Sequence, residues 1–352
     1  MKKLLSIGLA AMLAFGLATT SFAASDTDAA GSDNTTGAIP YVDKSVVEIT
    51  KNYEATNSGT TSPAEEFTFT IEKVGVEDAA VGITKDNMPV PEIVGVSYGA
   101  GDAGSANKTK KIQVKLNGAD GKTIYKGVGV YTYTIKEVVG TTAGVTYYGN
   151  PITLKVTVIE QDGQIRVAAV HTEEDPVGQK LSTITNTYSA GSLAVEKVVE
   201  GNLGDKNKKF NVKVTFAKPT GKSVKGTISY IEDGKTKTIA PEAWNDKESV
   251  EVTIALKDQE TITFTNIPYE VTYTVAEDDY ASEKYIAYYQ YTDSNEKDDK
   301  TVNSALEQVT ITNNKDGSID TGVVLNNMPY ILVLAVLAAG VAVFIIRKRR
   351  ED

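Results

Sequence analysis

The sequence contains no cysteine and only one histidine in 352 residues. Without cysteine there is no disulfide, no thiolate metal site and no thiol nucleophile. A single histidine, His171, leaves zinc sites and histidine-based catalytic groups without the partners that they need. We therefore expect no metal ion, and we look to other residue types for both stability and chemistry.

Basic residues are also few relative to acidic ones. Lysine and arginine total 36 against 46 aspartates and glutamates, which gives a formal net charge of -10, so nucleic acid is not an expected partner. The stretch Gly99–Gly104 has the spacing of a dinucleotide-binding loop, but the strand-like pattern Ile112–Leu116 follows it where such a site needs a helix. We expect no nucleotide and no other cofactor.

Both ends of the chain carry signals typical of export and anchoring. Lys2 and Lys3 precede an apolar run that ends in small residues at Ala23, which predicts a signal peptide. Residues 328–346 are almost wholly apolar, long enough to span a membrane, and are followed by a basic tail that would stay cytoplasmic. The body between the two signals is therefore expected outside the cell.

That body alternates apolar and polar residues, as strands do. The alternation begins at Val46, stops at a hinge-like stretch at 189–192, and resumes from Leu193 to Asn313. This predicts an all-β fold of two tandem immunoglobulin-like β-sandwich domains. The expected order is a signal peptide at 1–23, a flexible lead at 24–41, an N-terminal β-sandwich at 42–189, a C-terminal β-sandwich at 190–316, and a tail at 317–352 with its transmembrane helix at 328–346.

A lysine, a glutamate and an asparagine occur in the same order in each predicted domain, always on the apolar face of a strand. They are Lys51, Glu137 and Asn186 in the first domain, and Lys197, Glu277 and Asn313 in the second. Burying such groups is costly unless something compensates. One interpretation of each residue is a strand-end position whose polar tip reaches water.

The other interpretation is a covalent bond between the lysine and the asparagine. Desolvation favours the neutral forms of lysine and glutamate. The neutral amine then attacks the asparagine side chain, the glutamate assists by shuttling protons, and ammonia leaves. Such bonds would close loops of 135 and 116 residues and stabilise each domain by about 5 kcal/mol on a chain-entropy model.

The sequence resembles the T-antigen-type backbone pilins of Gram-positive bacteria, which consist of two collagen-adhesin B-type isopeptide domains. The matching segments are Ile49–Asn52, Gly144–Tyr147, Val195–Gly201 and Glu277–Tyr285. The resemblance implies the cross-linking roles given above and a structural subunit rather than an enzyme, apart from the single-turnover formation of its own bonds.

The tail resembles a sortase sorting signal, with Ile319, Asp320, Thr321 and Gly322 as its motif and no proline at the usual position. The resemblance implies cleavage after Thr321 and transfer of its carbonyl to a lysine of the next subunit, for which Lys180 is the positional match and another exposed lysine the alternative. The implied partners are a sortase, other pilin subunits in a covalent homopolymer, and cell-wall peptidoglycan. Membrane contact would occur only through the helix before sorting, and the product would be a wall-anchored surface pilus.

Two other functions stay open at this point. The same stalk domains would suit a monomeric surface adhesin anchored to the wall or the membrane, and the unusual sorting motif keeps that alternative in view. A secreted enzyme is the third, but the sequence offers no catalytic constellation other than the two buried triples.

Overall fold

The computed structural model describes residues 43–293 and 300–317. The predicted signal peptide, flexible lead, sorting motif and transmembrane helix lie outside the described residues. Within those residues, no helix has the length and apolarity that a membrane span requires.

The N-terminal half folds into two five-stranded sheets and a short two-stranded ribbon. The sheet orders are β4-β6-β1-β12-β8 and β11-β10-β9-β7-β3, and β2 pairs with β5. The bounds are β1 (Val46–Ala55), β2 (Glu65–Phe67), β3 (Phe69–Glu77), β4 (Glu92–Val94), β5 (Val96–Tyr98), η1 (Asp102–Gly104), η2 (Ala106–Lys108), β6 (Thr109–Lys115), β7 (Gly129–Glu137), β8 (Val145–Thr146), β9 (Ile152–Gln161), β10 (Gln164–Glu174), β11 (Gln179–Lys180) and β12 (Thr183–Tyr188).

The C-terminal half folds into a six-stranded sheet, β16-β15-β18-β13-β21-β20, and a three-stranded sheet, β17-β14-β19. Its elements are β13 (Ala190–Glu200), β14 (Phe210–Ala217), β15 (Ile228–Glu232), β16 (Lys235–Ile239), η3 (Pro241–Trp244), β17 (Ser249–Leu256), β18 (Thr261–Pro268), β19 (Thr272–Glu277), η4 (Ala281–Glu283), β20 (Ile286–Asp293) and β21 (Leu306–Asn314).

The prediction of an all-β fold is confirmed, because every helix among the described residues is a short 3-10 turn. Each half has its own principal core, built from the alternate residues of its strands that face inward. In β1, for example, Val47, Ile49 and Tyr53 are buried, whereas Val46 and Glu48 are exposed. The alternation that identifies the strands in the sequence is thus the alternation that fills the core.

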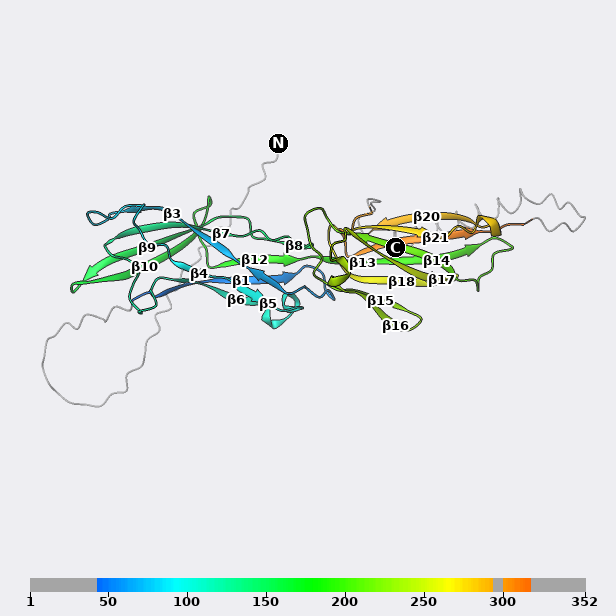
Figure 1. The fold of residues 1–352 in the computed structure, drawn as a ribbon, viewed down its shortest axis with the longest axis horizontal. Coiled ribbons are helices and arrows are strands. Elements are labelled where there is room, and N and C mark those ends of the chain that lie inside the picture. The colour runs from blue at the N-terminus through cyan, green and yellow to red at the C-terminus, as the bar shows by residue number, and fades with distance from the viewer. Residues whose placement is uncertain (1–42, 294–299, 318–352) are drawn as a thin grey trace, which may run out of the picture. The chain divides into compact units, whose positions relative to one another are not determined.

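In each half, the first and last long strands are parallel neighbours. β1 lies beside β12, and Lys51 is opposite Ile184 while Asn186 is opposite Tyr53. Figure 1 shows this pair as a blue and a green arrow side by side. Because residues two apart on a strand face the same way, the lysine and the asparagine point to the same side and are offset by two residues along the ladder.

The C-terminal half repeats this arrangement with the same offset. β13 lies beside β21 in parallel, with Lys197 opposite Ile311 and Asn313 opposite Val199. The glutamate of each triple comes from the other sheet of its half, from β7 in the first and from β19 in the second. Each triple therefore joins both layers of its half.

Candidate cross-linking sites

All six side chains of the two triples are buried. The two lysines and the two asparagines have no exposed surface. The exposed fractions of the Glu137 and Glu277 side chains are 0% and 2%. No polar tip reaches water, so the interpretation of these residues as ordinary strand-end positions is wrong. The cost of their burial has to be met by their contacts with one another.

In the first site, Glu137 contacts both of the groups that would react. Its Oε2 lies 2.5 Å from Lys51 Nζ, and its Oε1 accepts a hydrogen bond from Asn186 Nδ2. Lys51 Nζ lies 2.6 Å from Asn186 Oδ1. A carboxyl that bridges the amine and the amide nitrogen is placed to take a proton from one and give it to the other.

Burial shifts both ionisable groups of this site toward their neutral forms. Desolvation lowers the pKa of Lys51 to about 8, although the charge and the hydrogen bond of Glu137 oppose the shift. Desolvation likewise raises the pKa of Glu137, against the influence of Lys51 and Asn186. A neutral amine is a nucleophile and a protonated carboxyl is a proton donor, which is what amide attack requires.

The second site has the same composition with looser contacts. Lys197 Nζ lies 3.2 Å from Glu277 Oε1 and 3.3 Å from the backbone oxygen of Ile311, to which it donates. Asn313 Nδ2 donates to Glu277 Oε2 at 2.6 Å. Desolvation lowers the pKa of Lys197 as well, while Glu277 opposes the shift. The carboxyl again bridges the two nitrogens.

An aromatic ring covers each lysine, a feature that the sequence analysis missed. Lys51 Nζ lies 4.9 Å from the ring centre of Phe67, and Lys197 Nζ lies 4.7 Å from that of Phe210. The rings exclude water from the amines and so contribute to the desolvation that lowers their pKa values. Each phenylalanine stands in the first strand after its lysine strand, so a comparison of the two halves in sequence would have found both.

Lys180, the predicted linking lysine, is exposed on β11, a short edge strand in which it pairs with Glu173 of β10. Its side chain is therefore accessible to another protein. The four residues of the sorting motif, 319–322, lie outside the described residues, so their position relative to Lys180 is not given.

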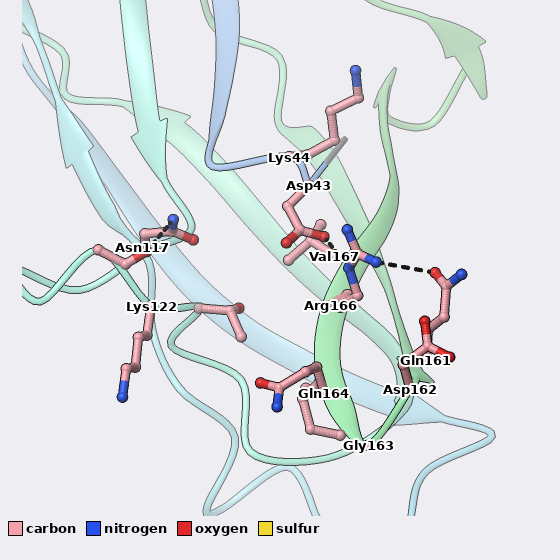
Figure 2. A pocket seen from close by; sticks show the side chains of 13 residues that line it. Asp43, Lys44, Asn117, Lys122, Gln161, Asp162, Gly163, Gln164, Arg166 and Val167 are labelled. Atoms are coloured by element: carbon pink, nitrogen blue, oxygen red, sulfur yellow. Dashed lines mark hydrogen bonds and ion pairs between the residues drawn. The ribbon is translucent and has the colours of Figure 1, made fainter. Parts of the chain in front are cut away.

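A surface cavity of about 760 Å³ lies apart from both triples, at the turn between β9 and β10. Figure 2 shows the Arg166 side chain in this cavity turned toward its partners. Arg166 donates to Asp43 and to Gln161, at 2.8 and 3.2 Å. No residue of either triple lines the cavity.

Among the described residues, no group of three or more histidines, cysteines, aspartates or glutamates is placed to hold a metal ion. His171, the single histidine of the sequence, contacts Glu173 at 3.1 Å on the surface.

Comparison with known proteins gives matches over both halves. Residues 47–189 match the family described as the Spy0128-like isopeptide containing domain, and residues 191–315 match a domain of unknown function, DUF7601. A curated pilin of Streptococcus pyogenes serotype M1 is 30% identical over 96% of this chain and 98% of its own length.

Solved structures agree with this assignment. The crystal structure of the major pilin from Streptococcus pyogenes is 25% identical, covers 78% of this chain and all of that chain, and superposes with a TM-score of 0.52. A second major pilin of the same species, T3.2, shares the fold at 21% identity and a TM-score of 0.52, over 78% of this chain and 99% of its own. The extent of the match to the curated relative shows that this chain belongs to the pilin family of Gram-positive bacteria.

Proposed function

We propose that this chain is a structural backbone subunit of a sortase-assembled surface pilus, closed in each half by a Lys–Asn isopeptide bond that the protein forms itself. The observation that carries the proposal is the position of Glu137 and Glu277. Each buried carboxyl contacts both the lysine amine and the asparagine amide nitrogen of its site. Apart from this single turnover, the chain catalyses no reaction.

The reaction follows from the contacts of the first site. The neutral amine of Lys51 attacks the side-chain carbonyl carbon of Asn186, and the carbonyl electrons move to Oδ1. Glu137 gives its own proton to Nδ2 and takes one from Nζ on its other oxygen, so that it ends protonated as it began. The C–Nδ2 bond breaks and ammonia leaves. The products are one secondary amide and one ammonia, and the site no longer holds a buried amine that could become charged. Lys197, Glu277 and Asn313 play the same parts in the second site.

The structural benefit comes from joining the first strand of each half to the last. β1 with β12, and β13 with β21, are parallel neighbours, so tension that enters by one strand leaves by the other. A covalent bond between them carries that tension without loading the strands in between. A chain without cysteine has no disulfides for this purpose, and the isopeptide bonds take their place.

Assembly and location complete the proposal. We propose two domains, at 42–189 and 190–316, between a signal peptide that ends at Ala23 and a sorting signal at 317–352. The sortase cleaves after Thr321 and transfers its carbonyl to Lys180 of the next subunit, and the base of the fibre is joined to peptidoglycan. Support comes from the exposure of Lys180 and from membership of the pilin family.

The intact mass of a fragment from Ala24 to Asp320, which contains every described residue, tests the cross-links. The wild-type fragment should lack the mass of two ammonia molecules, and Glu137→Ala and Glu277→Ala should each lack only one. Glu307→Ala, which removes a different buried glutamate, is the control and should keep both losses. A wild-type fragment of full mass would refute the isopeptide proposal.

A further inference from the structure

The asparagine oxygens of the two sites have different surroundings. Asn186 Oδ1 accepts a hydrogen bond from the backbone N–H of Tyr148 at 2.8 Å, in addition to its contact with Lys51. Asn313 Oδ1 is equally buried, but in the part of the chain that the structure describes it has no hydrogen-bond partner. In each site, the asparagine Oδ1 is the atom that gains negative charge when the lysine amine attacks the amide.

The difference arises from the strand beside each asparagine. In the first half, β8 pairs with β12 for only two residues, Thr146 opposite Thr187 and Val145 opposite Tyr188. The chain then leaves the ladder, and the N–H of Tyr148 turns onto the Asn186 side chain. In the second half, β20 stays paired past the asparagine, with Ala287 opposite Asn313 and Tyr288 opposite Thr312. Among the described residues, no backbone N–H of this paired strand donates to Asn313 Oδ1.

We propose that the Tyr148 backbone N–H is the oxyanion donor of the first site, and that the second site, to which the described residues supply no such donor, forms its bond more slowly. In the first site, the electrons displaced from the Asn186 carbonyl are held on Oδ1 by this N–H until they return and expel ammonia. A fixed backbone donor aimed at a developing oxyanion in a buried site lowers the barrier without reorganisation. The inference rests on the proposed isopeptide reaction and adds a catalytic group to it.

The same N–H faces the carboxyl of Glu137 and opposes the rise in its pKa. An effect on Glu137 has to be separated from an effect on the oxyanion. Loss of a group that tunes Glu137 would move the pH at which the rate is half-maximal. Loss of an oxyanion donor would lower the rate by the same factor at every pH.

The two bonds are timed separately in newly made chains. Chains with Glu277→Ala form only the first bond, and chains with Glu137→Ala form only the second. Both are synthesised in a short in-vitro pulse, quenched in acid at intervals, and weighed for the loss of ammonia. The first bond is expected to form faster. A second bond that forms as fast as the first, or faster, would overturn the inference.

Replacing the Tyr148 residue by its α-hydroxy acid, through nonsense suppression in the Glu277→Ala chain, removes only the N–H. Formation of the first bond should slow by about a hundredfold, the typical effect of losing one oxyanion donor. The same replacement at Val145 is the matched control, because its N–H donates to the backbone oxygen of Thr142 in the same segment. Equal rates for the two esters, or a shift of the pH profile alone, would contradict the oxyanion role.

The outcomes separate the inference from the proposal beneath it. If no chain loses ammonia, the isopeptide reaction is absent, and both the isopeptide proposal and the oxyanion inference are wrong. If both bonds form but the Tyr148 ester is as fast as the control, only the oxyanion role falls. The comparison between the two natural sites needs no ester, so it decides the inference even if the ester chain folds poorly.

Discussion

At the scale of single residues, burial shifts the lysine of each site toward its uncharged form, against the attraction of the neighbouring glutamate. Lys51 has no exposed surface, and its pKa is lowered to about 8 because desolvation outweighs the attraction of Glu137. Before the bond forms, the folded state therefore releases a lysine proton that the unfolded state still holds. This makes stability depend on pH in any variant that cannot react.

We predict that Asn186→Ala, which keeps the amine and the carboxyl but removes the target, becomes more stable as pH rises from 8. The folded pKa lies below the unfolded value of 10.5, so the stability present above 10.5 is lost as pH falls through 8. The full difference corresponds to about 3 kcal/mol. Urea unfolding at pH 7.5, 8.5 and 9.5 should show roughly 2 kcal/mol of this rise and stays below the range where the unfolded tyrosines ionise.

The control for this prediction is Lys51→Met with Asn186→Ala, which removes the titrating amine and should abolish most of the slope. An unchanged slope in the double variant would assign the pH dependence to other groups.

At the scale of secondary structure elements, the period of the strand decides whether a site exists. Asn313 and Ile311 face the core, whereas Thr310 and Thr312 face outward on β21. The reactive amide must lie on the inner face and two positions beyond the residue opposite the lysine. Moving the asparagine by one position along the strand therefore takes its amide off the inner face and abolishes the site.

Exchanging the neighbours, Thr312→Asn with Asn313→Thr, should abolish the second bond at constant composition. The amide then lies on the outer face, out of reach of Lys197 and Glu277. Intact mass should show the loss of one ammonia instead of two. Exchanging Gln308 and Thr310, which share the outer face, is the control and should leave both losses.

A second ammonia lost by the exchanged chain would show that the face of the strand does not control the reaction.

At the scale of the whole molecule, each bond joins strands that are adjacent in space and far apart in sequence. Lys51 and Asn186 are 135 residues apart, and everything between them lies outside the direct covalent path. The thermodynamic gain is about 5 kcal/mol for a closed loop of this size on a chain-entropy model. The mechanical gain is that tension passes through the covalent bond and does not load the intervening strands.

Pulling on single molecules should therefore show no unfolding of either half of the wild-type chain. Glu277→Ala should release the loop between Lys197 and Asn313, which adds roughly 400 Å at 3.3–3.6 Å per residue. The first half, still cross-linked, is the internal control. A wild-type chain that extends by this length would contradict the load-bearing role of the bond.

Polymer formation tests the link between subunits. In cells that make the pilus, Lys180→Ala should abolish the ladder of high-mass species on a denaturing gel, because the exposed amine that takes over the Thr321 carbonyl is gone. Lys155→Ala, which removes an exposed lysine of β9 in the same sheet, should leave the ladder unchanged. A ladder that survives Lys180→Ala assigns the link to another lysine, and no ladder in the wild type favours the monomeric adhesin.

The sequence by itself determined the all-β fold and the inward faces of the strands, because a period of two is a local property that needs no knowledge of partners. It also placed the polar residues of both triples on those inner faces, since the order of lysine, glutamate and asparagine occurs twice. Only the tertiary structure decided that the first and last strands are parallel neighbours with the same offset in both halves. That pairing is a contact between distant segments, which local periodicity does not specify.

The tertiary structure also decided which aromatic rings and which backbone groups lie beside the reacting atoms. Phe67 and Phe210 lie over the lysines because of how their strands pack, and the N–H of Tyr148 reaches Asn186 because β8 ends after two residues. Every residue but proline has a backbone N–H, so no residue type marks the one that is aimed at a reacting oxygen. The difference between the two sites is therefore a property of the fold rather than of the sequence motif that they share.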